Sequence, residues 1–472
     1  MSFVKQAKQS VGWTFIKQIS VQGVNFIVQL ILARLLAPSD FGIIAMILVF
    51  IAIGQSLMDS GMTSSLIREK DVGDEDFSTV FLSNVGISII IYIVIFIIAP
   101  YISIFYQQPI LTNLLRAFSL SFVIGSFNAV QLAKLTRELN FKSQFFYQLP
   151  SVLISAVIGI LCAYHGYGVW SLVYLNLTQA FAFAVFTWVF SDWKPKLVFD
   201  KQLFKKHFNF GYKLTLSGLI DTLYQNLYKI IIGKYFNPTA VGFFSQADNL
   251  RLFPINQISL VLDKVTYPLF SKIGNDKKLK EVFISLQQLV LSFSSVIMIV
   301  LVLIAKPLFY LLLGEKWMPA VHFFQILCVA SVFRPIGTYN LNILKIKGRS
   351  DLFLKLEIIK KIIGVSVLIF SISKGIDGLV WGLCLTNIFF AYFNGYYSGK
   401  LIGYKMLSQF KDTGYTLLLS LLPIIPCLYL QTFLSENYQI ILFIPFFYFL
   451  QYVIVTYLFN KTLLIQIRKI LK

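Results

Sequence analysis

Long apolar runs recur along almost the whole chain and leave its backbone few possible structures. Hydrocarbon offers a peptide group no hydrogen-bond partner, so a run of about 20 apolar residues crosses a membrane as a helix. Hydrophobic residues fill 57% and charged residues 13% of the 472 positions, whereas charged residues make up about 25% of an average soluble domain. The sequence therefore predicts an all-α polytopic membrane protein without a sizeable soluble domain.

Breaks at proline, glycine and charged residues divide the chain into fourteen predicted spans. They lie near residues 13–37, 41–66, 79–100, 111–133, 148–165, 168–191, 210–236, 241–268, 284–313, 318–343, 352–373, 376–399, 412–432 and 438–460. Lysine and arginine collect in every second connection and near both ends of the chain, as they do in cytoplasmic loops. This alternation predicts that both termini are cytoplasmic. The net charge of +20 is spread over these short loops rather than gathered on one patch, which argues against nucleic-acid binding.

A stretch near the start of the chain returns 200 residues later. ILARLLAPSDFGII at 31–44 aligns with IIGKYFNPTAVGFF at 231–244 and keeps the cation, the proline and the glycine, and GYGVWSL at 166–172 is echoed by GIDGLVWGL at 375–383. Six helices per copy is an even number, so the copies enter the membrane in the same direction, as parallel repeats. We therefore predict two lobes around a central cavity. The N-lobe covers 1–195 and the C-lobe 210–400, and a cytoplasmic linker at 196–209 joins them. Two additional helices and a basic tail follow at 401–472.

The residue types that hold metals or form disulfides are scattered. The four cysteines stand singly in apolar runs, and the three histidines lie far apart without clustered carboxylates. The chain also lacks the GxxxxGK[ST] loop that cradles nucleotide phosphates. We expect no metal site, no cofactor and no enzymatic activity.

Two stretches and the opening helix carry a family resemblance. ARLLAPSDFG at 33–42, IGKYFNPTAVGFFSQA at 232–247 and the Gly12-Trp13 opening resemble the Wzx-type polysaccharide flippases of the multidrug, oligosaccharidyl-lipid and polysaccharide exporter superfamily. The resemblance extends over nearly the whole chain. Relatives often carry an acid directly before the cation of the seventh span, where this chain has Tyr228 before Lys229, so the role of that acid is not carried over.

The resemblance implies a flippase of the bacterial cytoplasmic membrane. Its substrate would be an undecaprenyl-pyrophosphate-linked oligosaccharide, moved from the cytoplasmic to the outer leaflet by alternating access for O-antigen, capsule or exopolysaccharide synthesis. Its other partners would be membrane lipids and further polysaccharide assembly proteins. Two alternatives are a drug or organic-cation exporter of the same superfamily and a membrane-embedded glycan polymerase. The basic candidate residues argue against the first, and the short external connections against the second.

Polar and ionisable residues inside spans are the natural candidates for substrate contact, because a charge at a helix centre costs roughly 2.5–3.5 kcal/mol or more. The candidates for pyrophosphate or sugar are Arg251, Lys229, Arg334, Arg116, Gln22, Asn25, Gln225 and Asn249. Arg251 ranks first, since its planar guanidinium suits pyrophosphate. Each has a structural alternative: a salt bridge for Arg251, an interfacial position for Arg116, and hydrogen bonds between helices for the amides.

The candidates for a coupling or structural acid are Asp59, Asp221, Asp248 and Asp263, each within a predicted span. A carboxylate whose pKa is raised by burial can carry a coupling proton, and a buried structural hydrogen bond is the alternative. The sequence leaves the coupling ion open between H⁺, Na⁺ and none.

Overall fold

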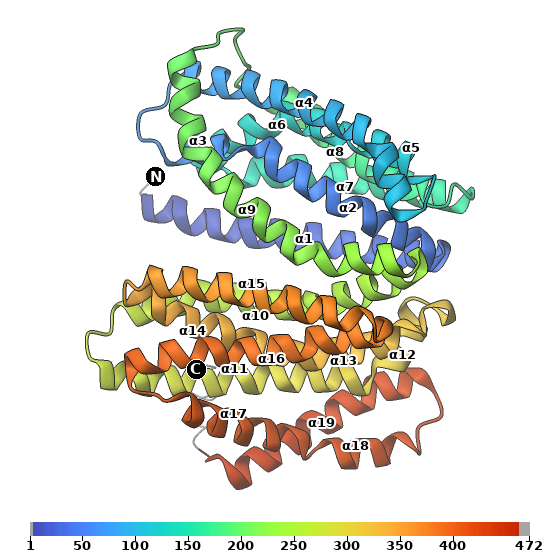
Figure 1. The fold of residues 1–472 in the computed structure, drawn as a ribbon, viewed down its shortest axis with the longest axis vertical. Coiled ribbons are helices and arrows are strands. Elements are labelled where there is room, and N and C mark those ends of the chain that lie inside the picture. The colour runs from blue at the N-terminus through green and yellow to red at the C-terminus, as the bar shows by residue number, and fades with distance from the viewer. Residues whose placement is uncertain (1–2, 462–472) are drawn as a thin grey trace. The chain divides into compact units, whose positions relative to one another are not determined.

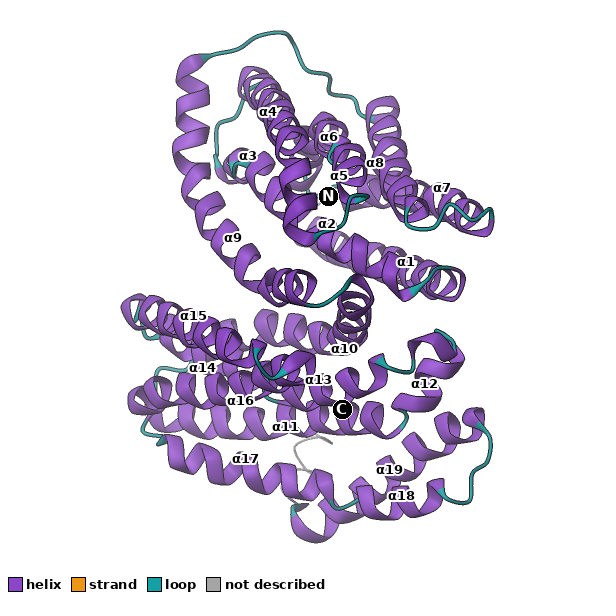
Figure 2. Cartoon of the chain, turned by 45° about the vertical axis from the view of Figure 1, so that its right-hand side comes forward, coloured by secondary structure: helices purple, strands orange, loops and turns teal. Residues whose placement is uncertain are grey.

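The computed structural model describes the backbone of residues 3–461 and the side chains of residues 9, 10, 12–58, 60–259, 262 and 266–461. Over this range every regular element is a helix, and loops or turns join them (Figure 2). The chain forms two compact units, Met1–Gly242 and Phe243–Lys472. Each can be followed by its colour in Figure 1. The predicted all-α class is confirmed.

Unit 1 is built from nine helices over the residues that the structure describes. They are α1 (Phe3–Leu35), α2 (Pro38–Asp59), α3 (Met62–Arg68), α4 (Asp74–Tyr106), α5 (Leu111–Phe118), α6 (Leu120–Arg137), α7 (Phe141–Tyr164), α8 (Trp170–Phe190) and α9 (Lys201–Tyr235). Helix α7 packs between α1 and α8, α4 packs on α6, and α9 crosses α2, α3 and α4.

Helix α10 (Pro238–Ser271) begins at the end of unit 1 and continues into unit 2. The other described helices of unit 2 are α11 (Asp276–Leu303), α12 (Ala305–Leu312), a short 3₁₀ turn η1 (Glu315–Trp317), α13 (Ala320–Val332), α14 (Arg334–Ile346), α15 (Ser350–Ile372), α16 (Gly375–Ile402), α17 (Met406–Leu421), α18 (Ile424–Gln431) and α19 (Asn437–Phe459). Helix α16 packs on α13, α14 and α15, while α19 packs on α12 and α18.

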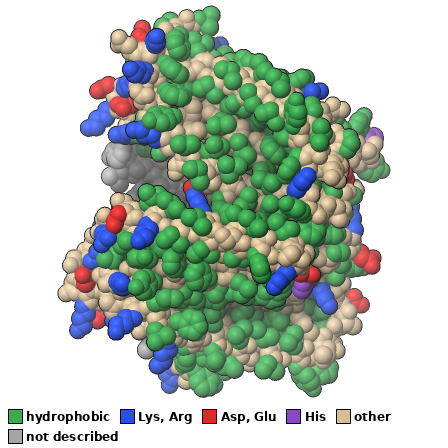
Figure 3. All heavy atoms as spheres, in the orientation of Figure 1, with side chains coloured by type: hydrophobic (Ala, Val, Ile, Leu, Met, Phe, Trp, Pro, Cys, Tyr) green, Lys and Arg blue, Asp and Glu red, His purple; other side chains and the backbone are tan. Residues whose placement is uncertain are grey.

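Eleven segments among the described residues are long and apolar enough to cross a membrane. Their outer faces are apolar as well: on α4, the side chains of Ile90, Ile97, Tyr101 and Ile104 are exposed by 60% or more. Figure 3 shows hydrophobic side chains over much of one face, and within unit 1 the charged side chains gather at the end where α4 and α9 begin. The chain is therefore a multi-pass membrane protein.

Three further helices match predicted spans but are too polar to count among these eleven. They are α9, α10 and α15, of 35, 34 and 23 residues, so each has the length that a span requires. Helix α9 carries Asp221 and Lys229, α10 carries Asp248 and Arg251, and α15 carries the ion pair of Lys360 with Glu357. These charges are consistent with the absence of α9, α10 and α15 from the eleven apolar segments.

The two copies of the repeated motif fold alike and touch one another. In each copy two residues separate the end of one helix from a proline that opens the next helix, Pro38 in the first and Pro238 in the second. A Cβ on Gly42 would lie 1.6 Å from the carbonyl oxygen of Pro238, and a Cβ on Gly242 would lie 2.0 Å from that of Pro38. Each copy therefore supplies the glycine that lets the backbone of the other approach.

A buried hydrogen-bond chain fastens the first half of α9 within unit 1. His207 is fully buried, and its ring nitrogens lie 2.9 Å from Ser65 Oγ on α3 and 2.9 Å from Asp76 Oδ1 on α4. One turn further along α9, a Cβ on Gly211 would lie 2.1 Å from the carbonyl oxygen of Ser60. Asp76 and His207 are 131 residues apart, so no clustered carboxylate in the sequence indicated this contact.

The compact units divide the chain differently from the predicted lobes. Helix α9 lies in unit 1, although its span at 210–236 was assigned to the second lobe. The segment 196–209, predicted as a linker, is helical from Lys201, because the carboxylate of Asp200 caps the helix by accepting from the N–H groups of Gln202 and Leu203 at 2.6 and 2.8 Å. The lobes were predicted from the sequence repeat, whereas the units are defined by packing, so the lobes stay a prediction.

The glycine contact gives a first test. Replacing Gly42 with leucine should destabilise the protein by at least about 1–3 kcal/mol, because the new side chain overlaps the backbone at Pro238. The midpoint of thermal unfolding in detergent measures the effect. Gly86→Leu on α4 is the control, since a Cβ at Gly86 meets nothing within 4 Å, and an equal loss in both variants would contradict the role given to Gly42.

Candidate functional site

Arg251 of α10 is buried and held from two sides. It is 6% exposed, its Nε donates to Oδ1 of Asp248 at 2.9 Å, and its Nη2 donates to the same oxygen. Its Nη1 donates to Oγ of Ser331 on α13 at 2.7 Å, and that hydroxyl in turn donates to the carbonyl of Leu327 at 2.8 Å. The guanidinium is therefore fixed in position, as the structural alternative for Arg251 required.

Arg334 of α14 lies within electrostatic range of this pair. It is the first residue of α14, and Pro335 follows it; the proline lacks an N–H, which explains the break between α13 and α14. The charges of Arg251 and Asp248 both act on Arg334. Arg334 is exposed, and it makes no ion pair within the part of the chain that the structure describes.

Arg251, Asp248 and Arg334 together form what we call the arginine cluster. Its formal charge is +1, from two guanidiniums and one carboxylate. Two cations within a membrane-spanning region repel one another more strongly than in water, because the effective dielectric constant is lower. A bound anion would relieve that repulsion. The positive end of the α14 dipole, which lies at Arg334, adds to the positive potential that would attract such an anion.

The other candidate of unit 2, Asn249, is exposed on α10 next to Asp248. The side chain of Asp263, predicted as a second possible partner for Arg251, lies outside the described residues, and so does that of Asp59 in unit 1. These two acids stay predictions.

In unit 1 the polar candidates lie on two helices. Gln22 and Asn25 are exposed on α1, and Asp221, Gln225 and the half-buried Lys229 follow one another at four-residue spacing on a single face of α9. Lys229 has no hydrogen-bond or ion-pair partner among the described side chains. The spacing that the sequence showed is thus kept in a continuous helix.

Arg116 does not belong with these residues. Its Nε donates to the carbonyl of Phe96 at 3.2 Å, and its guanidinium lies 4.1 Å from the centre of the Phe96 ring. It sits in the last turn of α5. These contacts hold Arg116 against α4, and its interfacial position stays a prediction.

Two interactions of the structure were not predicted from the sequence. Ser331 was one serine among many, and only its hydrogen bond with Arg251 marks it out. Lys360 and Glu357, whose side chains are 11% and 29% exposed, form an ion pair inside α15 at a spacing of three residues, and that spacing of opposite charges within a predicted span was a usable signal. Among the described residues, no group of three or more His, Cys, Asp or Glu could hold a metal ion.

The arginine cluster gives a second test. Asp248→Ala should destabilise the protein by about 3–5 kcal/mol, because it leaves the buried Arg251 without its carboxylate. Asp248→Ala combined with Arg251→Met should recover most of that loss, measured as the thermal midpoint in detergent. The matched control is Asp351→Ala, which removes the partner of the exposed Arg349 and should change the midpoint little. If the double variant is no more stable than Asp248→Ala, the two side chains are not coupled.

Comparisons with known proteins agree with this architecture. The family Polysacc_synt_3, described as polysaccharide biosynthesis protein, matches residues 31–322, more than half of the chain. The lipopolysaccharide biosynthesis protein WzxC of Escherichia coli K12 is 25% identical over 82% of this chain and 80% of its own.

Two solved structures share the fold. The lipid II flippase MurJ in an inward closed conformation superposes with a TM-score of 0.73 at 15% identity, over 97% of this chain and 99% of its own. An inward-facing multidrug resistance MATE transporter gives a TM-score of 0.63 at 16% identity, over 84% of this chain and 98% of its own. Both similarities concern the fold alone. With its match over residues 31–322, the chain belongs to the polysaccharide biosynthesis protein family.

Proposed function

We propose that this protein is a flippase that moves undecaprenyl-pyrophosphate-linked oligosaccharide repeat units from the cytoplasmic to the outer leaflet of a bacterial cytoplasmic membrane. The units would serve the synthesis of O-antigen, capsule or exopolysaccharide. Membership of a polysaccharide biosynthesis family and eleven apolar segments support this proposal. A sugar and a pyrophosphate cannot cross hydrocarbon unaided, so the protein must supply polar groups within the membrane.

The arginine cluster is the observation that carries the proposal. A pyrophosphate diester has two negative charges, which suits a cluster of two guanidiniums and one carboxylate. Arg334, which has no ion-pair partner among the described residues, would contact the pyrophosphate directly. Arg251, fixed by Asp248 and Ser331, would hold a second positive charge at a constant position.

The three polar helices would line the route of the head group. Counting α9, α10 and α15 as spans beside the eleven apolar segments gives the fourteen of our proposal. The amides of Gln22, Asn25, Gln225 and Asn249 would then hydrogen-bond the sugar, and Lys229 would attract phosphate from α9. The polyprenyl chain would stay in lipid.

Alternating access by two parallel repeats is part of the proposal. The reciprocal contact between Gly42 and Gly242 supports it. If the two repeats are related by an axis along the membrane normal, the two copies of one motif are expected to meet symmetrically. The basic connections place both termini in the cytoplasm under the same proposal. Other polysaccharide assembly proteins would receive the flipped unit.

The energy source is proposed only as a choice between H⁺, Na⁺ and no coupling ion. Asp221 on α9 and Asp248 on α10 are the described acids proposed for coupling, and Asp248 accepts from Arg251. An organic-cation exporter is the weaker alternative, because the arginine cluster would repel a cationic substrate. A glycan polymerase is weaker still, since the solved structures of this fold are transporters by their titles.

Leaflet-resolved labelling of the lipid-linked oligosaccharide in a deletion strain tests the function. We expect the unit to accumulate on the cytoplasmic side and to be released by the native chain. A distribution that the deletion leaves unchanged, in a strain without a second flippase, would contradict flippase function, and a drug-export assay would follow.

The same assay separates the two classes of arginine. Arg334→Ala should lower the transport rate at least about tenfold, because it removes a charge-assisted contact with the substrate, and Arg334→Lys should restore part of it. Arg116→Ala, which loses only its contacts with Phe96, should transport at nearly the native rate when expressed to the same level. Equal rates for Arg334→Ala and Arg116→Ala would refute the assignment of Arg334.

A further inference from the structure

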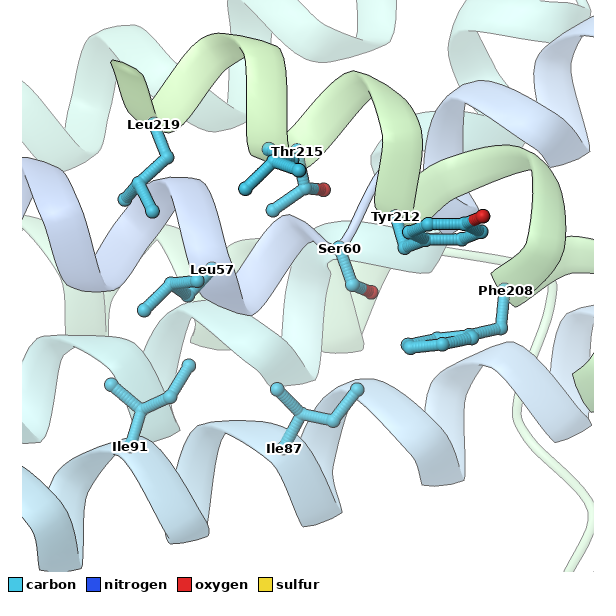
Figure 4. Close-up of a pocket in the computed structure, with 9 residues that line it drawn as sticks. Leu57, Ser60, Ile87, Ile91, Phe208, Tyr212, Thr215 and Leu219 are labelled. Carbon is cyan, nitrogen blue, oxygen red and sulfur yellow. The ribbon is translucent and has the colours of Figure 1, made fainter.

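Unit 1 contains an apolar cavity among α2, α4 and α9, with a volume of about 410 Å³. Its size falls within the range of about 300–1,000 Å³ that is usual for ligand pockets. Figure 4 shows Leu57, Ile87 and Leu219 along its walls and Phe208 and Tyr212 at one end. None of these residues takes part in the proposed transport of sugar and pyrophosphate.

Two hydroxyl groups interrupt the apolar lining. Ser60 on the turn after α2 and Thr215 on α9 both line the cavity, and Ser60 is only 4% exposed. Within the described part of the chain, Ser60 Oγ and Thr215 Oγ1 are buried and have no hydrogen-bond partner. A buried hydroxyl without a partner is costly, so these two atoms point to a ligand with a hydrogen-bonding group at this depth.

The backbone holds Ser60 in an unusual conformation. Its φ is 40°, in the left-handed region that costs a residue with a Cβ roughly 1–2 kcal/mol. The next residue, Gly61, has a φ of 65°, and a Cβ there would lie 2.5 Å from the carbonyl oxygen of Gly211 on α9. The turn and α9 therefore fix each other, and the hydroxyl of Ser60 stays at the cavity wall.

The aromatic end of the cavity leads to a basic surface. The rings of Phe208 and Tyr212 stack at 5.9 Å with an interplanar angle of 21°. Lys205 precedes Phe208 by three residues on α9, so it stands on the same helix face, one turn beyond the ring. Lys205 is exposed and is not part of any ion pair among the described residues, whereas its neighbour Lys206 pairs with Asp76 at 3.6 Å.

We propose that this cavity binds an acyl chain of an anionic glycerophospholipid from the bilayer. The chain would fill the apolar part, its ester carbonyl would accept from Ser60 and Thr215, and its phosphate would lie beside Lys205. Gly211, which contacts Ser60, follows Lys205 by six positions on α9, a rise of about 9 Å along the helix. This separation suits the phosphate and an ester group of one lipid. A polyprenyl chain offers no acceptor along its length and would leave both hydroxyls unpaired.

Native mass spectrometry of the full chain in detergent tests the proposal. The protein is incubated with phosphatidylglycerol, with phosphatidylcholine of the same chains, or with undecaprenyl phosphate. We expect one phosphatidylglycerol to be retained more tightly than either competitor. Ser60→Ala with Thr215→Val should weaken its retention about tenfold, because two hydrogen bonds are lost.

The charge and the location have their own controls. Lys205→Ala should abolish the preference for phosphatidylglycerol over phosphatidylcholine, and Lys411→Ala, which removes an exposed cation from α17 of unit 2, should leave it intact. A photo-crosslinking residue in place of Phe208 should capture phosphatidylglycerol in preference to phosphatidylcholine. The same residue in place of Phe446, which is 70% exposed on α19, should capture both equally.

Several outcomes would overturn the proposal. Tighter retention of undecaprenyl phosphate would assign the cavity to the transported lipid instead. Unchanged retention in the Ser60→Ala, Thr215→Val variant would show that the hydroxyls bind no lipid, provided that its thermal midpoint equals that of the native chain. Capture at position 208 without preference for the anionic lipid would identify ordinary bilayer contact. Because none of these measurements uses transport, their failure is independent of the proposed flippase function.

Discussion

The close approach of two backbones at Gly42 and Gly242 is the constraint on which the arrangement of unit 1 depends. Each glycine faces the carbonyl group of the proline in the other copy of the motif, at distances that leave no room for a Cβ. Because Pro38 and Pro238 also fix where α2 and α10 begin, the same short motif sets both the start of a helix and its contact. Helices in lipid gain little from burying apolar surface against one another, so close packing at small residues is a main source of their association.

Polar residues in this protein serve two different purposes, and their partners distinguish them. His207 and Arg116 are engaged by groups on neighbouring helices, Ser65 and Asp76 for the first and Phe96 for the second, and they stabilise unit 1. Lys229 and Arg334 have no such partners among the described residues. In a membrane the cost of an unpaired charge is high, and for this reason we propose these two cations, rather than the paired ones, for contact with the substrate.

The arginine cluster shows how one protein can combine both purposes. Asp248 and Ser331 satisfy Arg251, so its position does not depend on substrate, while Arg334 at the start of α14 remains available. A site of this kind keeps part of its positive charge in place whether or not an anion is bound. The cavity beside Ser60 differs from the arginine cluster, because its walls are mostly apolar and its two hydroxyl groups have no hydrogen-bond partner among the described residues.

The sequence by itself determined the helical class, the membrane location of the chain and the residues that carry its polarity. These follow from run length and composition, which act locally and need no tertiary partner. The repeat at 31–44 and 231–244 was also visible, and the helix breaks at its prolines followed from it.

Only the tertiary structure decided which of those residues are paired. Asp76 and His207 are 131 residues apart, Arg251 and Ser331 are 80 apart, and no local pattern links them. The same holds for α9, whose span was assigned by sequence to the second lobe but whose packing places it in unit 1. Membership of a compact unit depends on which helix faces meet, and apolar faces that look alike in sequence do not specify their partners.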